Sequence, residues 1–250
     1  MGYLKKLVAV FIYISPLWII FYHEQPIWIF VIAALLVVPL NAFAFSTVYH
    51  KLFAHRAFEP KIWVPILGEI IGALLFLATP FTFAAQHRLH HRFSDTDMDP
   101  HTPKYGKRFT YFPYFFTNKK LKAPDSSMFE KLTKDLARDF PTLYKIKDTH
   151  VFLFFIVFNT CLFFTSYTAF AVSISVVFLN LNLHGFANTF FHNVNKDGTV
   201  SIINMPFFAS ILSPEFNHAQ HHDVQKSHDF TTNDAKDWMA PIIERFLSRK

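Results

Sequence analysis

The chain has 250 residues, of which 52% are hydrophobic and 33 are phenylalanine, and its formal charge is +6. This composition is typical of a membrane protein rather than a soluble domain. A single cysteine, Cys161, excludes a disulfide framework and a cysteine-based zinc or iron–sulfur site, and only 6 glycines argue against a nucleotide-binding fold. The 14 histidines are the metal-capable residues in surplus.

Four apolar stretches, arranged in two pairs, predict two transmembrane hairpins. The first pair covers roughly residues 6–22 and 27–48, joined by the turn HEQP, and the second covers 151–165 and 168–187, joined by TSYT. Neither turn contains Lys or Arg, so all 24 basic residues lie on the opposite side of the membrane. The positive-inside rule makes that side cytoplasmic.

A fifth apolar stretch, residues 62–85, is long enough to cross the membrane. A crossing would move most of the basic residues outside and would place His50 on the opposite side from His87. Pro65 and Pro80 also interrupt the stretch. We therefore predict an interfacial or re-entrant helix here, with a fifth span as the alternative.

These elements predict an all-α membrane protein that forms a single domain, residues 1–250. Four transmembrane helices in two hairpins (6–48 and 151–187) would carry an interfacial helix and a cytosolic helical cap (49–150 and 188–250) that holds a di-metal site.

Within the expected cap, residues 125–147 have the pattern of an amphipathic helix that mostly faces solvent. Residues 109–116, FTYFPYFF, are flanked by basic residues, a combination that suits an anionic membrane surface. Nucleic acid is the alternative partner for basic residues, but no recognition motif accompanies them, so we expect no nucleic-acid binding.

Nine histidines recur in four motifs, HKLFAH, HRLHH, NTFFH and HAQHH, each at a predicted membrane boundary. On an α-helix, positions i, i+3 and i+4 fall within an arc of about 100°, so HRLHH and HAQHH can each aim three rings to one side. The two histidines of HKLFAH would lie about 140° apart. They suit two neighbouring ions, or one ion if the helix ends between them. The nine residues are His50, His55, His87, His90, His91, His192, His218, His221 and His222.

A solvated loop, a pH sensor and a metal-scavenging tract are alternatives to a metal site. Scavenging tracts are contiguous, whereas these motifs are far apart in the sequence. Nine clustered imidazolium ions would repel one another, while a metal binds the neutral rings, so a shared metal site is favoured. Two ions with four or five nitrogens each would use all nine rings. Imidazole suits zinc, copper, iron and nickel, so the residue types leave the metal open.

The ordered motifs HX4H, HX2HH, NX3H and HX2HH, interleaved with two apolar hairpins, resemble the integral-membrane fatty acid desaturases. HHRFSDTDMDPH is similar to the second histidine box of their acyl-CoA or Δ9-type branch. The resemblance extends from about residue 27 to the segment DWMAPIIERF. It implies a mushroom-like fold with four transmembrane helices under a cytosolic cap. It also implies a di-iron centre held by the nine histidines, with Asn188 contacting one iron through a water.

The resemblance further implies an O2-dependent oxidoreductase that removes two hydrogens from adjacent methylenes of a fatty acyl chain. An unactivated C–H bond requires a strong metal-based oxidant, around which the protein supplies positioning and electrostatics. The expected partners are an acyl-CoA, acyl-carrier or acyl-lipid substrate and membrane lipid. The chain has no cytochrome b5-like segment, so we also expect a separate electron donor of the ferredoxin or cytochrome b5 type.

Carboxylates near the histidines are expected to hold the rings in the right tautomer. Each could instead be a loop or cap carboxylate. The candidates are Asp95, Asp97, Asp99, Glu215 and Asp223. His101 is a single, loop-like histidine that would face either these partners or solvent.

Aromatic and basic residues near the motifs are candidates for substrate contacts. Arg88, Arg92 and the basic segment 104–122 could hold an anionic head group or an electron donor, or could form a solvated face. The residues that could line an apolar substrate path, or simply pack the core, are Phe43, Phe45, Phe83, Phe190 and Phe191.

Three features depart from the family pattern: NVNKDGTVSI after His192, the third box, HAQHHD, and the basic and acidic residues of 104–149. They leave open the acyl carrier, the bond position, and desaturation as against a related hydroxylase or oxygenase reaction. A non-catalytic metal-binding membrane protein is the alternative from another class. It would place ionisable residues within the spans, which are almost free of charge.

Overall fold

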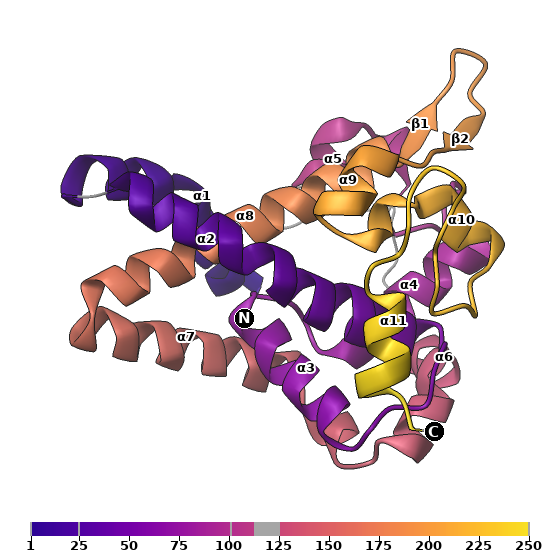
Figure 1. The fold of residues 1–250 in the computed structure, drawn as a ribbon, viewed down its shortest axis with the longest axis horizontal. Coiled ribbons are helices and arrows are strands. Elements are labelled where there is room, and N and C mark those ends of the chain that lie inside the picture. Colours follow the sequence, from indigo (N-terminus) through magenta and orange to yellow (C-terminus); the bar gives the residue numbers. More distant parts are fainter. Residues whose placement is uncertain (1, 25, 101, 113–125, 250) are drawn as a thin grey trace.

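The computed structural model of the chain describes residues 2–24, 26–100, 102–112 and 126–249. In Figure 1 the long helices extend toward one end of the molecule, and the shorter elements gather at the other. Within the described residues, four helices are long and apolar enough to cross a membrane. They are α1 (Gly2–Tyr22), α2 (Pro26–Asn41) with its continuation η1 (Ala42–Ala54), α7 (Asp148–Thr165) and α8 (Tyr167–Phe190). The predicted all-α membrane fold with four spans is confirmed.

Helix α8 is the central element of this bundle. It packs against α1, α2 and α7, and it buries Ile174, Val177 and Leu181 in the interface. The outer faces of the bundle remain apolar and exposed, with Leu35 on α2 71% exposed and Phe164 on α7 79% exposed. Exposed apolar surface of this extent fits contact with lipid chains.

The apolar stretch 62–85 contains no helix long enough to cross the membrane, which fits the predicted interfacial or re-entrant helix. It contains α3 (Trp63–Leu74), a loop, and the start of α4 at Pro80. At about 1.5 Å per residue, α3 is roughly 18 Å long, well short of a hydrocarbon core of about 30 Å. Helix α3 packs closely against η1 at two glycines. A Cβ atom at Gly68 would lie 2.5 Å from Val48, and one at Gly72 would lie 2.3 Å from the Tyr49 hydroxyl.

The second transmembrane helix changes its winding as it leaves the membrane. After Asn41, α2 continues as η1, a π-helix of 13 residues whose side chains are mostly buried. In a π-helix each N–H bonds to the carbonyl five residues earlier, so each turn contains about one more residue than an α-helical turn. The last such bond, from His55 N to His50 O, is 3.1 Å long.

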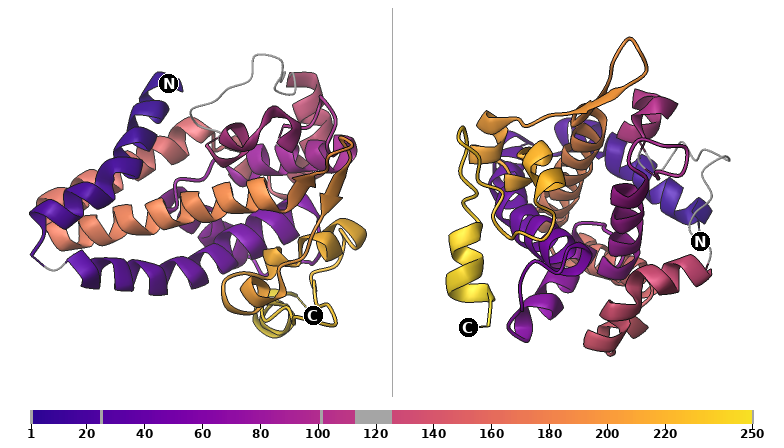
Figure 2. Two further views of the ribbon diagram at one scale, coloured as in Figure 1. Left: turned by 90° about the horizontal axis from the view of Figure 1, so that it is seen from above. Right: turned by 90° about the vertical axis from the view of Figure 1, so that its right-hand side faces the viewer.

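The cap is built from short elements of the central and C-terminal parts of the chain. Its β-hairpin pairs His192 with Ile202 and Val194 with Val200, and it projects from the cap (Figure 2). This hairpin is formed by the NVNKDGTVSI segment, whose turn contains Gly198 at φ +82°. The cap elements are α4 (Pro80–Phe93), η2 (Pro103–Tyr105), α5 (Lys107–Tyr111), α6 (Ser126–Asp139), η3 (Leu143–Lys145), β1 (His192–Val194), β2 (Val200–Ile202), α9 (Pro206–Ile211), η4 (Pro214–Phe216), α10 (His218–Asp223), α11 (Ala240–Ile242) and η5 (Ile243–Leu247).

The predicted amphipathic helix over residues 125–147 is too long. The helix α6 ends at Asp139, because Pro141 disfavours helical geometry in the preceding residue. Its inner face is also more deeply packed than expected, since Leu136 and Thr133 are fully buried. The aromatic and basic segments expected at the membrane surface lie partly in residues 113–125, outside the described part of the chain.

Candidate metal centre

The structure brings all nine histidines together at the membrane end of the cap, in two groups. The first histidine group contains His50, His55, His87, His91 and His221, and the second contains His90, His192, His218 and His222. Within each group the possible ligand atoms all lie within 4.8 Å of one another. Residues separated by up to 172 positions in the sequence therefore converge on two neighbouring points.

The spacing of the nitrogens fits a metal site. In the first group, Nε2 of His87 lies 2.9 Å from Nε2 of His50, His55 and His91. In the second group, Nε2 of His218 lies 3.0 Å from that of His192 and 3.2 Å from that of His222. A metal–imidazole bond of about 2.1 Å with neighbouring ligands at right angles gives an N···N separation of about 3.0 Å. The two groups are therefore spaced as ligands around an ion.

Helices α4 and α10 each contribute to both groups. On α4, His87 and His91 are four residues apart and join the first group, while His90 joins the second. On α10 the division is reversed, with His218 and His222 in the second group and His221 in the first. Side chains at i and i+4 lie nearly above one another, whereas i+3 is turned to one side. The shared HX2HH spacing thus places each helix between the two groups.

His50 and His55 join the same group, although an ideal α-helix would separate them by about 140°. The cause is the winding of η1, in which residue i+5 returns to the face of residue i. The π-helix also ends at Ala54, so the His55 ring extends from the helix terminus. Of the two arrangements that the spacing allows, the structure contains the one in which the helix ends between the histidines.

Three of the five candidate carboxylates contact a histidine Nδ1. His50 Nδ1 lies 2.5 Å from Glu215 Oε2, and His90 Nδ1 lies 2.9 Å from Asp99 Oδ1. His192 Nδ1 lies 3.2 Å from both carboxylate oxygens of Asp95. A carboxylate at Nδ1 keeps the ring proton there and leaves the Nε2 lone pair directed at the other rings. Such a set of converging lone pairs fits a cation, which relieves their mutual repulsion.

The other two candidate carboxylates do not reach the histidines. Asp97 is exposed and interacts with Tyr105. Asp223 is exposed, because it follows His222 directly and therefore points to another side of α10. Asn188 lies in the wall of the cavity beside the second group. His101 lies outside the described residues.

Burial and mutual repulsion keep five of these rings neutral, those of His87, His91, His218, His221 and His222. Burial, with a smaller contribution from neighbouring histidines, lowers the pKa of His91 to about 2 and that of His222 to about 3. The same causes hold the pKa of His87, His218 and His221 well below the ordinary value. Because metals bind neutral imidazole, these rings are ready to act as ligands at neutral pH.

Two of these carboxylates, Glu215 and Asp95, are held in the charged form. Burial alone would raise the pKa of Glu215, but His50, Lys51 and the Ser46 hydroxyl outweigh it and lower the pKa below its usual value. Burial likewise opposes ionisation of Asp95, and the contact with His192 reverses the effect. Ser46 Oγ donates to Glu215 Oε1 at 2.5 Å. Sequence reasoning missed Ser46, since 169 residues separate it from its partner.

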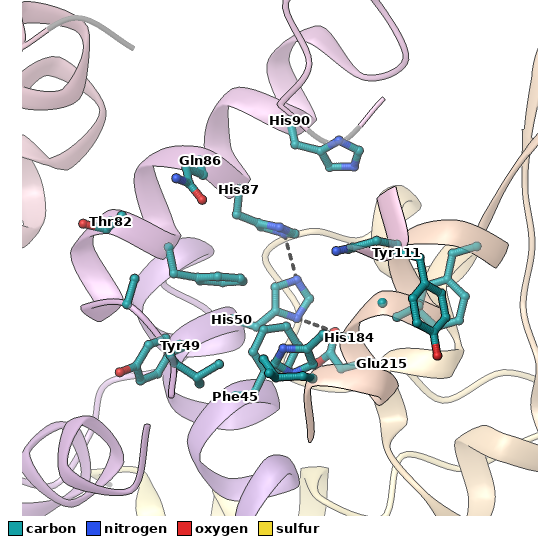
Figure 3. A pocket seen from close by; sticks show the side chains of 18 of the residues that line it. Phe45, Tyr49, His50, Thr82, Gln86, His87, His90, Tyr111, His184 and Glu215 are labelled. Atoms are coloured by element: carbon teal, nitrogen blue, oxygen red, sulfur yellow. Dashed lines mark hydrogen bonds and ion pairs between the residues drawn. The ribbon is translucent and has the colours of Figure 1, made fainter. Parts of the chain in front are cut away.

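Both groups open onto an apolar cavity of about 410 Å³ between the membrane helices and the cap (Figure 3). Of the five phenylalanines expected along a substrate path, Phe45, Phe83 and Phe191 line this cavity. Phe43 instead stacks on Trp63, with ring centroids 6.2 Å apart. Phe190 lies under the Lys107 ammonium, 5.3 Å away.

The expectation that Arg88 holds a head group is wrong. Its guanidinium makes two hydrogen bonds with the Asp135 carboxylate, at 2.7 and 3.0 Å, and also donates to the carbonyls of Phe53, Ala54 and Leu132. Arg88 therefore ties α4 to η1 and α6. It is fully engaged in this role, because a guanidinium has five N–H donors.

Comparison with known proteins gives the family. Residues 26–248 match the family described as fatty acid desaturase, and the chain belongs to that family. It is 32% identical over 83 residues to Delta-9 acyl-lipid desaturase 1 of Arabidopsis thaliana. It is 37% identical over 70 residues to an acyl-CoA Delta(11) desaturase of Trichoplusia ni. Over 91 residues it is 30% identical to sn-1 stearoyl-lipid 9-desaturase of Anabaena variabilis.

The aligned parts are short in comparison with the whole proteins. They cover 33%, 28% and 36% of this chain and 27%, 20% and 32% of those three relatives, respectively. These relatives fit the acyl-CoA and Δ9 branch that the second histidine box resembles.

Proposed function

We propose that the chain is a membrane fatty acyl desaturase that uses O2 and a di-iron centre. The nine histidines would hold the two ions, with Asn188 contacting one of them through a water. The observation that carries this proposal is that both histidine groups form part of the wall of one apolar cavity between the membrane helices and the cap. Membership of the desaturase family and the names of the relatives support a fatty acyl substrate.

The residues of the chain position the ligands and the substrate. Glu215, Asp99 and Asp95 retain the Nδ1 protons of their histidine partners, so that the Nε2 lone pairs face inward. Iron bound there would supply, with O2, the oxidant that removes hydrogen from two adjacent methylenes. Phe45, Phe83 and Leu181 would contact the acyl chain and exclude water from the reacting carbons.

The distribution of basic residues supports a site at the cytoplasmic face of the membrane, because both predicted outer turns lack Lys and Arg. Electrons would come from a separate protein of the ferredoxin or cytochrome b5 type that docks on the cap. The relatives act on acyl-lipids and on acyl-CoA according to their names, and we propose one of these carriers for the substrate.

Expression in a host with a simple lipid profile tests the proposal, with mass-spectrometric mapping of new double bonds. The parent chain should produce a new alkene, and His218→Ala should abolish it without changing the membrane topology. His228→Ala is the matched control, because this histidine contacts the exposed Glu244 and belongs to neither group.

Three outcomes would contradict parts of the proposal. An alcohol in place of the alkene would indicate a related hydroxylase or oxygenase. Iron-free protein that remains active would exclude the di-iron centre. Metal-loaded protein that yields no product with either donor type would favour a non-catalytic metal-binding protein.

A further inference from the structure

His184 is a tenth histidine beside the metal centre, but it belongs to neither group. It lies on α8, eight residues before His192, and its side chain lines the cavity. Its ring centroid is 4.1 Å from that of Phe45, and Figure 3 shows it beside Glu215. A polar ring in this position faces the space that the proposed acyl chain would occupy.

A chain of hydrogen bonds determines which nitrogen of His184 carries the proton. Asn180 Nδ2 donates to the Leu75 carbonyl at 3.2 Å. The reverse orientation of this amide would place two acceptors against each other, so Asn180 Oδ1 must face Asn41. Asn41 Nδ2 donates to that oxygen at 2.9 Å and also lies 3.0 Å from His184 Nε2. Both asparagines are buried, so no bulk water competes for these bonds.

Because an amide nitrogen can only donate, His184 Nε2 must be the acceptor. A neutral imidazole that accepts at Nε2 carries its proton on Nδ1. Nδ1 has no hydrogen-bond acceptor among the described residues. It is also not among the solvent-inaccessible side-chain atoms that lack a partner, so it is accessible from the cavity. The hydrogen bonds that run from the Leu75 carbonyl through Asn180 and Asn41 thus fix the tautomer of His184. In this tautomer the Nδ1–H group is a donor available to the cavity.

We propose that His184 is a specificity residue that binds an oxygen acceptor on the acyl substrate. A saturated hydrocarbon chain offers no partner for an N–H group, so a substrate oxygen at this level would be favoured over a methylene. That oxygen is either the carbonyl of the acyl linkage or a hydroxyl group along the chain. This inference rests on the proposed function, since it takes the cavity to be the acyl site.

Binding measurements test the inference without requiring turnover. The protein in detergent micelles would be titrated with matched lipid probes while its thermal stability is followed. One pair compares a stearoyl glycerol ester with the octadecyl glycerol ether, which lacks the carbonyl. The other compares stearic acid with a positional series of monohydroxystearic acids. The pair that shows a preference identifies the source of the oxygen.

We expect the parent to bind the oxygen-bearing member of one pair about 10-fold more tightly. His184→Phe should bring that ratio close to 1, whereas His184→Gln, which retains an N–H donor, should keep part of it. Asn41→Leu should also reduce the ratio, because the ring can then place its proton on Nε2. His228→Phe, a histidine variant outside the cavity, should leave the ratio unchanged.

The inference is overturned if the parent shows no preference in either pair, or if His184→Phe weakens both members equally. The result can be separated from the proposed function. A preference without any double-bond formation would retain the role of His184 and remove the desaturase proposal. Double-bond formation without a preference would do the reverse.

Discussion

His50 and Glu215 are 165 residues apart in the sequence, and they meet in the structure with Nδ1 and Oε2 only 2.5 Å apart. The other nitrogen of the same ring lies 2.9 Å from His87 Nε2. One imidazole therefore joins a buried carboxylate to the first histidine group. Glu215 in turn accepts from Ser46, which lies one π-helical turn before His50 on η1.

Glu215→Gln should weaken metal binding by the first group by about 10- to 100-fold. The amide keeps the size of the side chain, but it removes the negative charge that orients and polarises the His50 ring. Metal retained after dialysis against a graded chelator series, measured by elemental analysis, checks this. Asp223→Asn is the control, because Asp223 is exposed. Equal retention in parent and Glu215→Gln would contradict the role of the carboxylate.

His55→Ala and His222→Ala should each abolish binding at one of the two proposed ion sites. Each substitution deletes a ligand of only one group, since His55 belongs to the first and His222 to the second. Titration with Co²⁺, followed by its visible absorption bands, gives the stoichiometry and the type of ligand field. If either variant still binds two ions with the affinity of the parent, the division into two groups is wrong.

Glu69 should make the stability of the protein depend on pH. This residue on α3 is 4% exposed, and neither carboxylate oxygen has a hydrogen-bond partner in the described part of the chain. Burial raises its pKa from an ordinary 4.5 to about 7. The folded state therefore holds a proton that the unfolded state releases above pH 4.5. The stability contribution is complete below that pH and is lost as the pH rises to 7.

Glu69→Gln removes this dependence, because the amide remains neutral. Between pH 4.5 and 7.5 the free energy of unfolding of the variant should rise relative to the parent by roughly 3 kcal/mol. Thermal unfolding in detergent at the two pH values gives the difference. Glu130→Gln, on the exposed surface of α6, should show no such change. A parent-to-variant difference that is the same at both pH values would count against the buried, protonated carboxyl.

Lys51 and Asp237 form an ion pair in which both side chains are fully buried. The Lys51 ammonium also lies 4.5 Å from the centre of the Phe230 ring, and Asp237 accepts the backbone N–H groups of Phe230, Met239 and Ala240. Lys51→Met leaves a buried carboxylate without its cation and should lower the free energy of unfolding by about 3–5 kcal/mol.

Adding Asp237→Asn to Lys51→Met should restore part of that loss, because the second substitution removes the unpaired charge. Thermal unfolding of the parent, both single variants and the double variant forms a complete cycle. If the double variant is destabilised by the sum of the two single effects, the two charges do not interact energetically.

The membrane architecture follows from local properties of the sequence. The length of the apolar stretches was enough to predict the four spans. The absence of Lys and Arg from two turns indicated that residues 62–85 do not form a fifth span. The grouping of histidines could be anticipated because their spacings are those of helical faces. A division into sets of four and five could also be anticipated, but which histidine joins which group could not, because it depends on which way α4 and α10 face each other.

Other details depend on backbone geometry that no composition rule reveals. Asp95 contacts His192 and Asp97 does not, although they are two residues apart in one loop. Asp95 has a φ of 60°, in the left-handed region that aspartate tolerates better than most residues, and this turn determines the direction of its carboxylate. Arg88 was a candidate for substrate binding, but the partner that engages it, Asp135, lies 47 residues away.

The π-helix η1 limits how the chain can vary in length. Asn41, Ser46, His50 and Lys51 each face a different partner, on α8, η4, α4 and the segment before α11. A substitution changes one of these contacts, whereas a deletion of one residue between Ala42 and Tyr49 would rotate every residue that follows it. Such a deletion would turn His50 and His55 out of register with their group and separate Lys51 from Asp237. This stretch should therefore tolerate changes of side chain far better than any insertion or deletion.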